Sequence, residues 1–368
     1  MLLTAVAFIV LLTLLILIHE YGHFWAARKA GVVVEEFGFG LPPRARTLFT
    51  RHGTKFTLNW VPFGGFVRLK GENATTHAEH YAEGSFGKAP IFSRMVILTA
   101  GVFMNFVLAI ALLTFGFSVG RWVPTYFELD DMKRHAESGV ITLELGVLID
   151  QVVSGGSAAK AGVPVQSILL AVNDTPVTEA DQVAVLQEGK KRVSYTVLTG
   201  TGTGFEETYF FPLQDGKSGV ALYTVPRHIS APLRNPWTGF SLSLREARIM
   251  TKQTIIGIGA LFSSLAQTSR VPEGITGIVG IAQLTYTSVQ SGFMTYLRLV
   301  ALISLSLAIL NVLPFPALDG GRLLFVFAEA LVRRPLNRRF EAMVNAVGFF
   351  TLIALIIIIT FYDIARLF

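Results

Sequence analysis

The chain has 368 residues, of which 52% are hydrophobic and only 15% are charged. About 25% of the residues in soluble globular domains are charged, so the composition excludes a chain made only of such domains and favours a membrane protein. The sequence contains no cysteine, which excludes a disulfide framework and leaves nitrogen and oxygen ligands for any metal. The net charge of +6 comes without basic runs interleaved with aromatic residues, so no nucleic-acid partner is predicted.

Four apolar stretches reach the roughly 20 residues that a membrane-spanning helix needs. They lie near residues 2–27, 91–118, 296–331 and 345–365. The first stretch lacks the basic start and the small-residue cleavage site of a signal peptide, so we expect it to be retained. The sequence therefore predicts an α+β polytopic membrane protein with four transmembrane helices, surrounded by the lipid bilayer.

The basic residues are distributed unevenly between the connections. Residues 28–94 contain ten Lys or Arg against five Glu, and the link at 333–341 contains four Arg against one Glu. The long segment 121–297 contains fourteen Lys or Arg against fifteen Asp or Glu. Because short cytoplasmic loops carry an excess of Lys and Arg, the first two connections are expected in the cytoplasm. Both termini and the long segment are then predicted to be extracytoplasmic.

The connections differ in their predicted structure. Residues 32–72 alternate apolar and polar residues around Gly and Pro, which predicts a membrane-associated β-sheet loop, and short strand-like runs between about 140 and 227 indicate one small soluble domain. Trp237 to Gln267 has helical periodicity, but its apolar piece from Ile255 to Leu265 is too short to span, so we expect it on the membrane surface or packed on the bundle. The predicted parts are the first half of the membrane core at 1–120, the soluble domain at 121–230, the extracytoplasmic amphipathic segment at 231–295 and the second half of the core at 296–368.

The end of the first apolar helix carries the motif His19-Glu20-Tyr21-Gly22-His23. Positions four apart share one face of a helix, so His19 and His23 can bind one zinc ion while Glu20 reaches a water molecule on that ion. The alternative is a group of interfacial polar residues that form hydrogen bonds at a helix end. Three ionisable groups at membrane depth favour the functional interpretation.

A catalytic zinc site usually has three protein ligands and a water molecule, so a third ligand is expected. The best candidate is Asp319, in the run Asn311-Val312-Leu313-Pro314-Phe315-Pro316-Ala317-Leu318-Asp319-Gly320-Gly321. Its prolines break an apolar helix, and broken backbone at membrane depth is tolerated only where protein or water satisfies the freed groups, so the break predicts a cavity. The alternative is a simple kink that ends in a capping Asp, which the presence of the first motif disfavours.

The two motifs together, HExxH in a first membrane helix and NxxPxPxLDGG in a later one, resemble the two signatures of the site-2 protease family. The order of the predicted elements is similar to that of its bacterial regulator-of-sigma-E protease branch. The resemblance implies an intramembrane zinc metalloprotease of a bacterial inner membrane, with His19, His23 and Asp319 as ligands of one Zn²⁺ and Glu20 as the general base. It also implies that Asn311 helps to hold the substrate backbone.

Two further segments carry weaker signals. Ser157 to Gly162, followed by Ile168 to Val177, resembles the pattern of bacterial PDZ domains. One extracytoplasmic PDZ-like domain is therefore expected, which either binds a peptide ligand or only gates access. Gly64 and Gly65 fall in the loop that, in the family, forms a sheet dipping toward the active site, where an extended substrate can add to a strand edge. The alternative is that these glycines only make turns.

The resemblance implies that the substrates are single-pass membrane proteins, cleaved within or near their transmembrane segments. A trimmed anti-sigma factor and a remnant signal peptide are both compatible with it. The rival functions are a membrane adaptor with a structural metal and an ion or metal transporter. Glu20 beside two metal ligands argues against the adaptor, and one compact site without a following path of carboxylates argues against the transporter.

Overall fold

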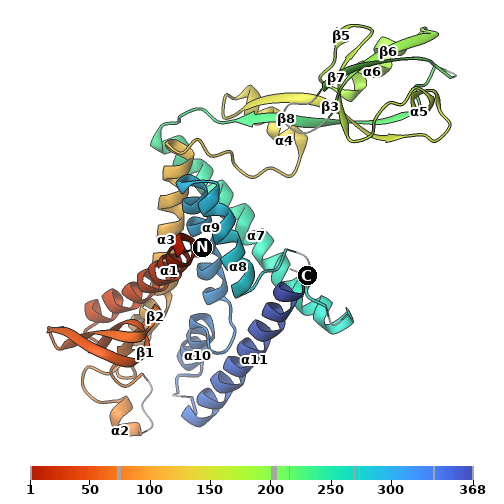
Figure 1. Ribbon diagram of the computed structural model, residues 1–368. Helices are drawn as coiled ribbons and strands as arrows, with labels where there is room; N and C mark the ends of the chain where they lie inside the picture. Colours follow the sequence, from red (N-terminus) through yellow and green to blue (C-terminus); the bar gives the residue numbers. More distant parts are fainter. Residues whose placement is uncertain are drawn as a thin grey trace. The chain divides into compact units, whose positions relative to one another are not determined.

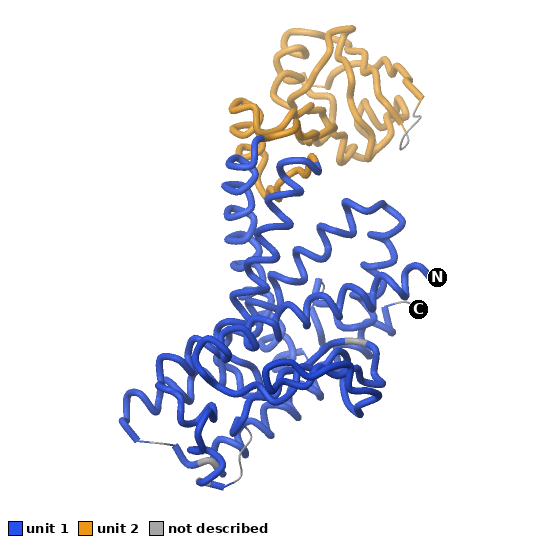
Figure 2. The backbone as a smooth tube through the Cα atoms, turned by 90° about the vertical axis from the view of Figure 1, so that its left-hand side faces the viewer, with its two compact units in different colours: residues 1–120, 235–368 blue, residues 121–234 orange. Residues whose placement is uncertain are grey.

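The computed structural model describes residues 2–72, 76–199, 205–214, 216–268, 270–272, 274–334 and 336–366. The chain divides into two compact units (Figure 2). Unit 1 consists of residues 1–120 and 235–368, and unit 2 consists of residues 121–234. Helices predominate in unit 1 and strands in unit 2, so the predicted α+β class is confirmed (Figure 1).

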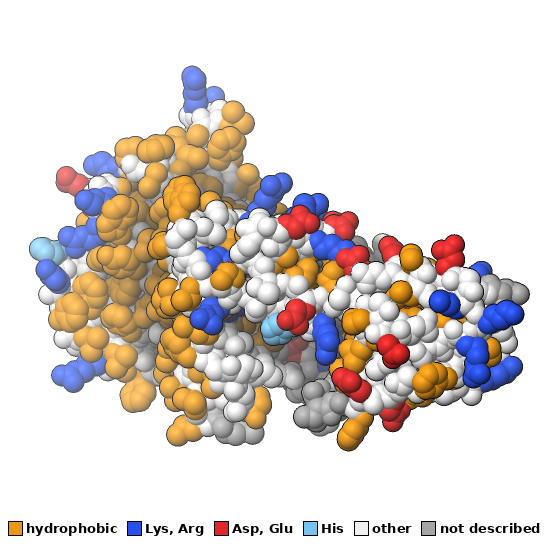
Figure 3. All heavy atoms as spheres, turned by 90° about the horizontal axis from the view of Figure 1, so that it is seen from above, with side chains coloured by type: hydrophobic (Ala, Val, Ile, Leu, Met, Phe, Trp, Pro, Cys, Tyr) orange, Lys and Arg blue, Asp and Glu red, His pale blue; other side chains and the backbone are white. Residues whose placement is uncertain are grey.

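Unit 1 is built mainly from long apolar helices. Its helices are α1 (Leu2–Lys29), α2 (His77–His80), α3 (Ile91–Ser118), α7 (Pro236–Thr268), α8 (Ile278–Gln290), α9 (Phe293–Val312), α10 (Asp319–Val332) and α11 (Arg338–Ala365) (Figure 1). Many of their large hydrophobic side chains are exposed, and Figure 3 shows such side chains gathered over these helices. An apolar outer surface of this kind is expected where lipid replaces water as the solvent.

Five helices within the described ranges are long and apolar enough to cross a membrane, namely α1, α3, α7, α9 and α11. The predicted count of four is therefore not confirmed. The difference lies in α7. Its 33 residues confirm the helix predicted from Trp237 to Gln267, but the helix as a whole, and not only its short apolar piece, is long and apolar enough to be a candidate span. The predicted packing of this segment on the bundle is present, because Ala247 of α7 is buried against Ala109 and Ile110 of α3 and against Leu305 of α9.

The predicted span at 296–331 is interrupted, as its prolines indicate. Helix α9 ends at Val312, two residues before Pro314, and α10 begins at Asp319. Proline lacks a backbone N–H and disfavours helical conformation in the residue before it, which explains where α9 ends. A Cβ atom on Gly320 would lie 2.1 Å from the Leu313 carbonyl oxygen, so the chain can turn back onto itself here only with glycine.

The predicted β-sheet loop is confirmed as an antiparallel pair of long strands, β1 (Val34–Arg51) and β2 (Thr54–Leu69). Both strands bend, because Phe37 pairs with Val67 on one side and with Phe56 on the other. The register therefore gives four short segments in the order 65–69, 34–41, 54–61 and 44–51. Segment 65–69 is one outer edge of this sheet within the described chain.

Glu36 lies at the centre of this sheet, where only 3% of it is exposed. Arg44 donates to both of its carboxylate oxygens, at 3.1 and 2.7 Å, and Thr57 donates to one at 2.8 Å. Arg68 lies 3.3 Å away. Burial alone would raise the pKa of Glu36, but these hydrogen bonds and the two arginine charges hold the pKa below its ordinary value. One carboxylate thus joins all four segments of the sheet.

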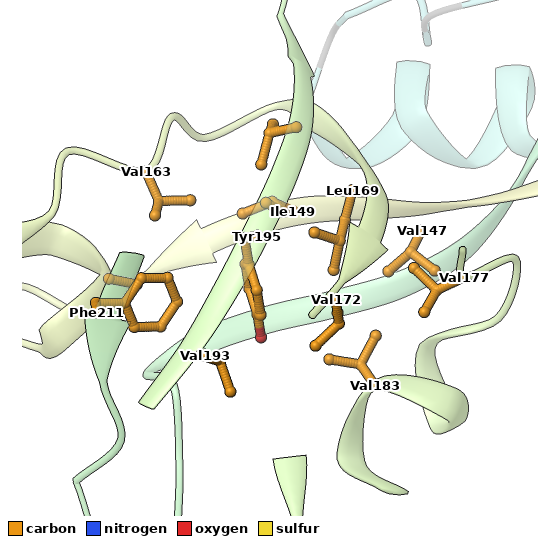
Figure 4. Close-up of a cluster of buried hydrophobic side chains, with 12 residues drawn as sticks. Val147, Ile149, Val163, Leu169, Val172, Val177, Val183, Val193, Tyr195 and Phe211 are labelled. Carbon is orange, nitrogen blue, oxygen red and sulfur yellow. The ribbon is translucent and has the colours of Figure 1, made fainter. Parts of the chain in front are cut away.

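Unit 2 is a small sheet domain. Its elements are α4 (Leu129–Glu137), β3 (Thr142–Val152), α5 (Ser157–Lys160), β4 (Ser167–Val172), β5 (Thr175–Pro176), α6 (Ala180–Gln187), β6 (Arg192–Thr199), β7 (Phe205–Pro212) and β8 (Val220–Ser230). The antiparallel order is β7-β6-β4-β3-β8, with β5 paired to β4. Its core includes Leu169, Tyr195 and Phe211, which lie together in Figure 4. The predicted strand-like runs lie in β6, β7 and β8 within the described part of the unit.

Unit 2 has a core of its own, so residues 121–234 are expected to fold alone. In that fragment, Leu169→Ala should lower the free energy of unfolding by about 2–5 kcal/mol, because it leaves a cavity among wholly buried side chains. Val185→Ala is the control, because Val185 is 70% exposed and should lose little. Urea unfolding followed by circular dichroism measures both. An excised fragment without a cooperative transition would contradict the expectation.

The Glu36 cluster predicts a pH dependence of stability. A lowered pKa in the folded state stabilises the protein above the ordinary carboxyl pKa, and this contribution is lost as the pH falls through the lowered value. Glu36→Gln should therefore cost about 1–3 kcal/mol at pH 7, with the lower end favoured by the 42% exposure of the Arg44 side chain. The difference from the parent protein should shrink in acid. Thermal unfolding of metal-free protein at pH 7 and at an acidic pH measures this difference. Glu35→Gln is the control, because Glu35 is an exposed neighbour. A loss of stability in Glu35→Gln equal to that in Glu36→Gln would contradict the prediction.

Candidate metal centre

The last turns of α1 place two histidines on one face. His19 and His23 are four residues apart, and each is only 9% exposed. Their Nε2 atoms lie 3.1 Å apart, with the two rings arranged edge to face. Two ring nitrogens that face each other at this distance inside an apolar helix bundle can supply two ligands of one metal ion.

Asp319, the first residue of α10, supplies the third group. Its Oδ2 atom lies 3.0 Å from His19 Nε2 and 3.3 Å from His23 Nε2. Each of the three side chains offers an atom that lies within 4.8 Å of the others. The fold therefore brings together the three candidate metal ligands that the sequence singled out, two of which lie about 300 residues before the third.

Helix α3 contributes no metal-ligating group but fixes the geometry. His23 Nδ1 lies 2.8 Å from the carbonyl oxygen of Ile97. A carbonyl only accepts, so Nδ1 carries the proton and Nε2 presents its lone pair toward Asp319 and His19. A Cβ on Gly101 would lie 2.3 Å from His23 Nε2, and a Cβ on Gly22 would lie 2.3 Å from the Ala100 carbonyl oxygen. Glycine is therefore required on both helices for the histidines to fit.

Glu20 lines the same space as the two histidines. Its Oε2 atom accepts a hydrogen bond of 3.0 Å from the backbone N–H of Val67, in edge segment 65–69. A cavity of about 340 Å³ lies in front of it. The side chains that line this cavity come from α1, from β2 and the turn after it, from α3 and from α10. They include His19, Glu20, His23, Arg68, Glu72, Ile97, Leu98, Asp319 and Arg322. The cavity that the broken helix predicts is present.

The three residues expected to hold substrate lie on α9 and β2. Asn311 is half-buried in the last turn of α9. Gly64 has a φ of 79°, and a Cβ on Gly65 would lie 2.7 Å from the Leu17 side chain on α1. Among the described residues, the cavity lining contains none of these three positions. The two glycines allow the sheet to approach α1 closely, and their adjacent segment carries Val67.

The donor set fits zinc. Two imidazole nitrogens and one carboxylate oxygen are a usual set of three protein ligands in a catalytic zinc site.

Several positions that complete the site were missed from the sequence, namely Gly22, Ile97, Gly101, Glu72 and Arg322. Only the two glycines carry a signal, because glycine is costly inside a helix unless another backbone comes close.

Comparison with known proteins agrees with this geometry. The profile of Peptidase family M50 matches residues 7–355. The regulator of sigma-W protease RasP of Bacillus subtilis (strain 168) is 26% identical over 450 residues, covering 99% of each chain. The zinc metalloprotease RasP of Bacillus licheniformis is also 26% identical, over 446 residues, again covering 99% of each chain.

The family match covers almost the whole chain, including both motifs and every helix that contributes to the cavity. Of these two relatives, which align from end to end, the first is named a protease and the second a zinc metalloprotease. The resemblance to the site-2 proteases is thereby confirmed. The chain belongs to peptidase family M50, the site-2 protease family of membrane-embedded zinc metalloproteases.

Proposed function

We propose that His19, His23 and Asp319 bind one zinc ion per chain and that Glu20 is the general base of an intramembrane endopeptidase. The observation that carries the proposal is the convergence of two Nε2 atoms and one Oδ2 atom within 3.0–3.3 Å. Glu20 lines the same cavity as these atoms. A structural metal site would not need a carboxylate beside its ligands, so the arrangement favours catalysis over an adaptor role.

The chemistry follows from the positions of these groups. When bound, zinc supplies Lewis acidity to a water molecule and to the scissile carbonyl. Glu20 accepts the proton of the attacking water and then delivers it to the leaving amine. The Val67 N–H orients the Glu20 carboxylate, and the Ile97 carbonyl keeps the His23 ring in the tautomer that can bind metal.

A helical substrate hides its carbonyl groups, so it must unwind before it can be cleaved. Edge segment 65–69 offers a partner for the unwound strand, since it pairs with segment 34–41 on one side only and its Val67 lies beside Glu20. Asn311 is proposed to bind the substrate backbone, and Gly64 and Gly65 to contribute to substrate binding by keeping this edge near α1. Helix-breaking residues in the substrate should therefore promote cleavage.

The proposed substrates are single-pass membrane proteins, cleaved within or near their transmembrane segments during regulated intramembrane proteolysis. A trimmed anti-sigma factor and a remnant signal peptide are the two candidate classes. Similarity to a protein named regulator of sigma-W protease favours the first. Trapping partners with the Glu20→Gln protein in native membranes would separate the two classes.

The proposed topology has four crossings, α1, α3, α9 and α11, in a bacterial inner membrane. Helix α3 starts beside the end of α10, where Arg94 binds Glu329, and α11 follows α10 directly, so α3 and α11 start on one side. Helix α7 begins beside the end of α3, because a Cβ on Gly239 would meet Ser118. Arg366, just after α11, donates to the Val271 carbonyl just after α7. Each end of α7 thus lies beside the end of a helix that starts on the proposed cytoplasmic side, which supports a topology in which α7 does not cross.

Unit 2 would then be extracytoplasmic, with both termini on the same side. The start of α1 and the end of α11 lie at a similar height in Figures 1 and 2, which supports this arrangement. We propose a PDZ-like role for unit 2, supported by its antiparallel sheet with the short helices α5 and α6. Binding of an extracytoplasmic peptide ligand and gating of access by bulky substrates are the two alternatives.

The zinc proposal predicts different losses for ligand and base. His23→Ala and Asp319→Ala should lose bound zinc, because each removes one of three ligands. Glu20→Gln should keep zinc but lose cleavage by about 10²-fold or more, because it removes only the base. Metal analysis and cleavage of a single-pass substrate by purified protein measure the two effects. Undiminished zinc in a ligand variant, or substantial turnover in Glu20→Gln, would contradict the assignment of that residue.

The topology proposal predicts which single cysteines react in this cysteine-free chain. Cysteines at Leu233, before α7, and at Gln267, near its end, should both react with a membrane-impermeant thiol reagent in intact cells. A cysteine at the exposed Lys88 should react only after the cells are opened. Protection of position 267 together with labelling of position 233 would mean that α7 crosses the membrane.

A further inference from the structure

Helix α10 presents one face to the rest of the protease core. Asp319, Arg322, Val326 and Glu329 follow one another at helical spacings of three and four, so they lie along one side of the helix. Val326 is buried in the cluster that contains Ala26 and Ile97. Leu324, Phe327 and Leu331, elsewhere around the helix, are 50%, 54% and 76% exposed. The Asp319 face therefore sets the rotation of α10.

A buried ion pair holds the far end of this face. Arg94, at the start of α3, donates from Nη1 to Glu329 Oε2 at 2.6 Å, and both residues are less than 10% exposed. The other Glu329 oxygen accepts from the backbone N–H of Leu336 at 3.1 Å, in the link to α11. One carboxylate thus fixes the end of α10 to α3 and to the following link.

A second ion pair lies one turn from Asp319. Arg322 Nη1 bonds Glu72, which follows edge segment 65–69, and Glu72 Oε2 accepts from the Leu69 N–H at 3.4 Å. Both residues line the catalytic cavity. The two ion pairs join positions 235 and 250 residues apart, so they connect the half of the core that carries the histidines to the half that carries Asp319.

Helix α10 needs such anchors because a small rotation about its axis would move the Asp319 carboxylate away from the two histidines. A side-chain oxygen lies about 6 Å from a helix axis, so a rotation of about 10° moves it by about 1 Å. Metal-ligand distances are held to about 0.2 Å. The chain on each side of α10 does not supply this precision: an irregular segment precedes it, and Arg333, with a left-handed φ of 54°, ends it.

We propose that Arg94 and Glu329, together with Arg322 and Glu72, are positioning residues that set Asp319 against His19 and His23. The proposal rests on the proposed zinc ligands. The two pairs differ in exposure. The Arg94–Glu329 pair is buried and fixes the helix, while the Arg322–Glu72 pair is partly exposed and links the edge strand to the metal-binding helix.

The test measures zinc affinity of the full-length protein in detergent, by competition with a chromophoric chelator. Glu329→Gln, which keeps an acceptor for the Leu336 N–H, should bind zinc about 10- to 100-fold more weakly. Arg94→Gln should show the same loss. Arg94→Lys should restore most of the affinity, because Arg94 makes its bond to Glu329 through one nitrogen and its Nε atom has no partner within the described residues.

A matched control separates positioning from general stability. Glu246 of α7 is also wholly buried and lies 3.2 Å from Arg298 of α9, away from the cavity. Glu246→Gln and Glu329→Gln should both lower the thermal unfolding temperature, but only Glu329→Gln should weaken zinc binding. An equal loss of zinc affinity in Glu246→Gln would overturn the proposal, because the effect would then be one of general destabilisation.

A variant at the exposed pair keeps the proposal testable if the Glu329 variants do not fold. Arg322→Gln and Glu72→Gln should each weaken zinc binding less than Glu329→Gln, and the double variant should be no weaker than the worse single one. Asp319→Asn distinguishes a failure of the ligand assignment from a failure of the positioning role. If it binds zinc like the parent, the ligand assignment fails. If it loses zinc while the Glu329 and Arg322 variants keep the parental affinity, only the positioning role is overturned.

Discussion

The close approach of α1 and α3 is the constraint on which the site depends. Gly22 lets α1 lie against the Ala100 carbonyl, and Gly101 leaves the space that the His23 ring occupies. A methyl group at either position would overlap backbone or ring atoms, so the two helices would have to separate. Separation would break the bond from His23 to Ile97, which fixes the ring tautomer. Helix α3 thus fixes the geometry of the candidate metal centre without supplying one of its proposed ligands.

The same helix also governs the second half of the core. Arg94 lies two turns before Gly101 on α3 and binds Glu329 of α10, whose first residue is Asp319. Helix α3 therefore positions the proposed ligands of both α1 and α10. The sheet completes the cavity from another side, with the buried Glu36 joining its four segments and Val67 reaching Glu20. Each of these contacts uses a polar group that would be costly to bury alone.

The sequence predicted the parts of this site that follow local rules. Helical spacing predicted that His19, Glu20 and His23 act together, and the prolines predicted the break before Asp319. The alternation of apolar and polar residues between 32 and 72 predicted the sheet loop. The sequence predicted the helix from Trp237 to Gln267, which α7 confirms, but only the apolar piece at Ile255 to Leu265 was compared with the length of a membrane span, so it missed that the whole helix is apolar enough to be a candidate span. It also missed the Arg94–Glu329 pair, since no local pattern relates residues 235 positions apart.

The central claim is that residues from α1 and α10 bind one zinc ion together. X-ray absorption at the zinc edge, on purified protein loaded with one equivalent of zinc, tests it most directly. The account predicts two imidazole nitrogens with carboxylate and water oxygen at about 2.0–2.2 Å, and loss of one oxygen ligand in Asp319→Asn. A spectrum with one imidazole or none, or one unchanged by Asp319→Asn, would contradict it.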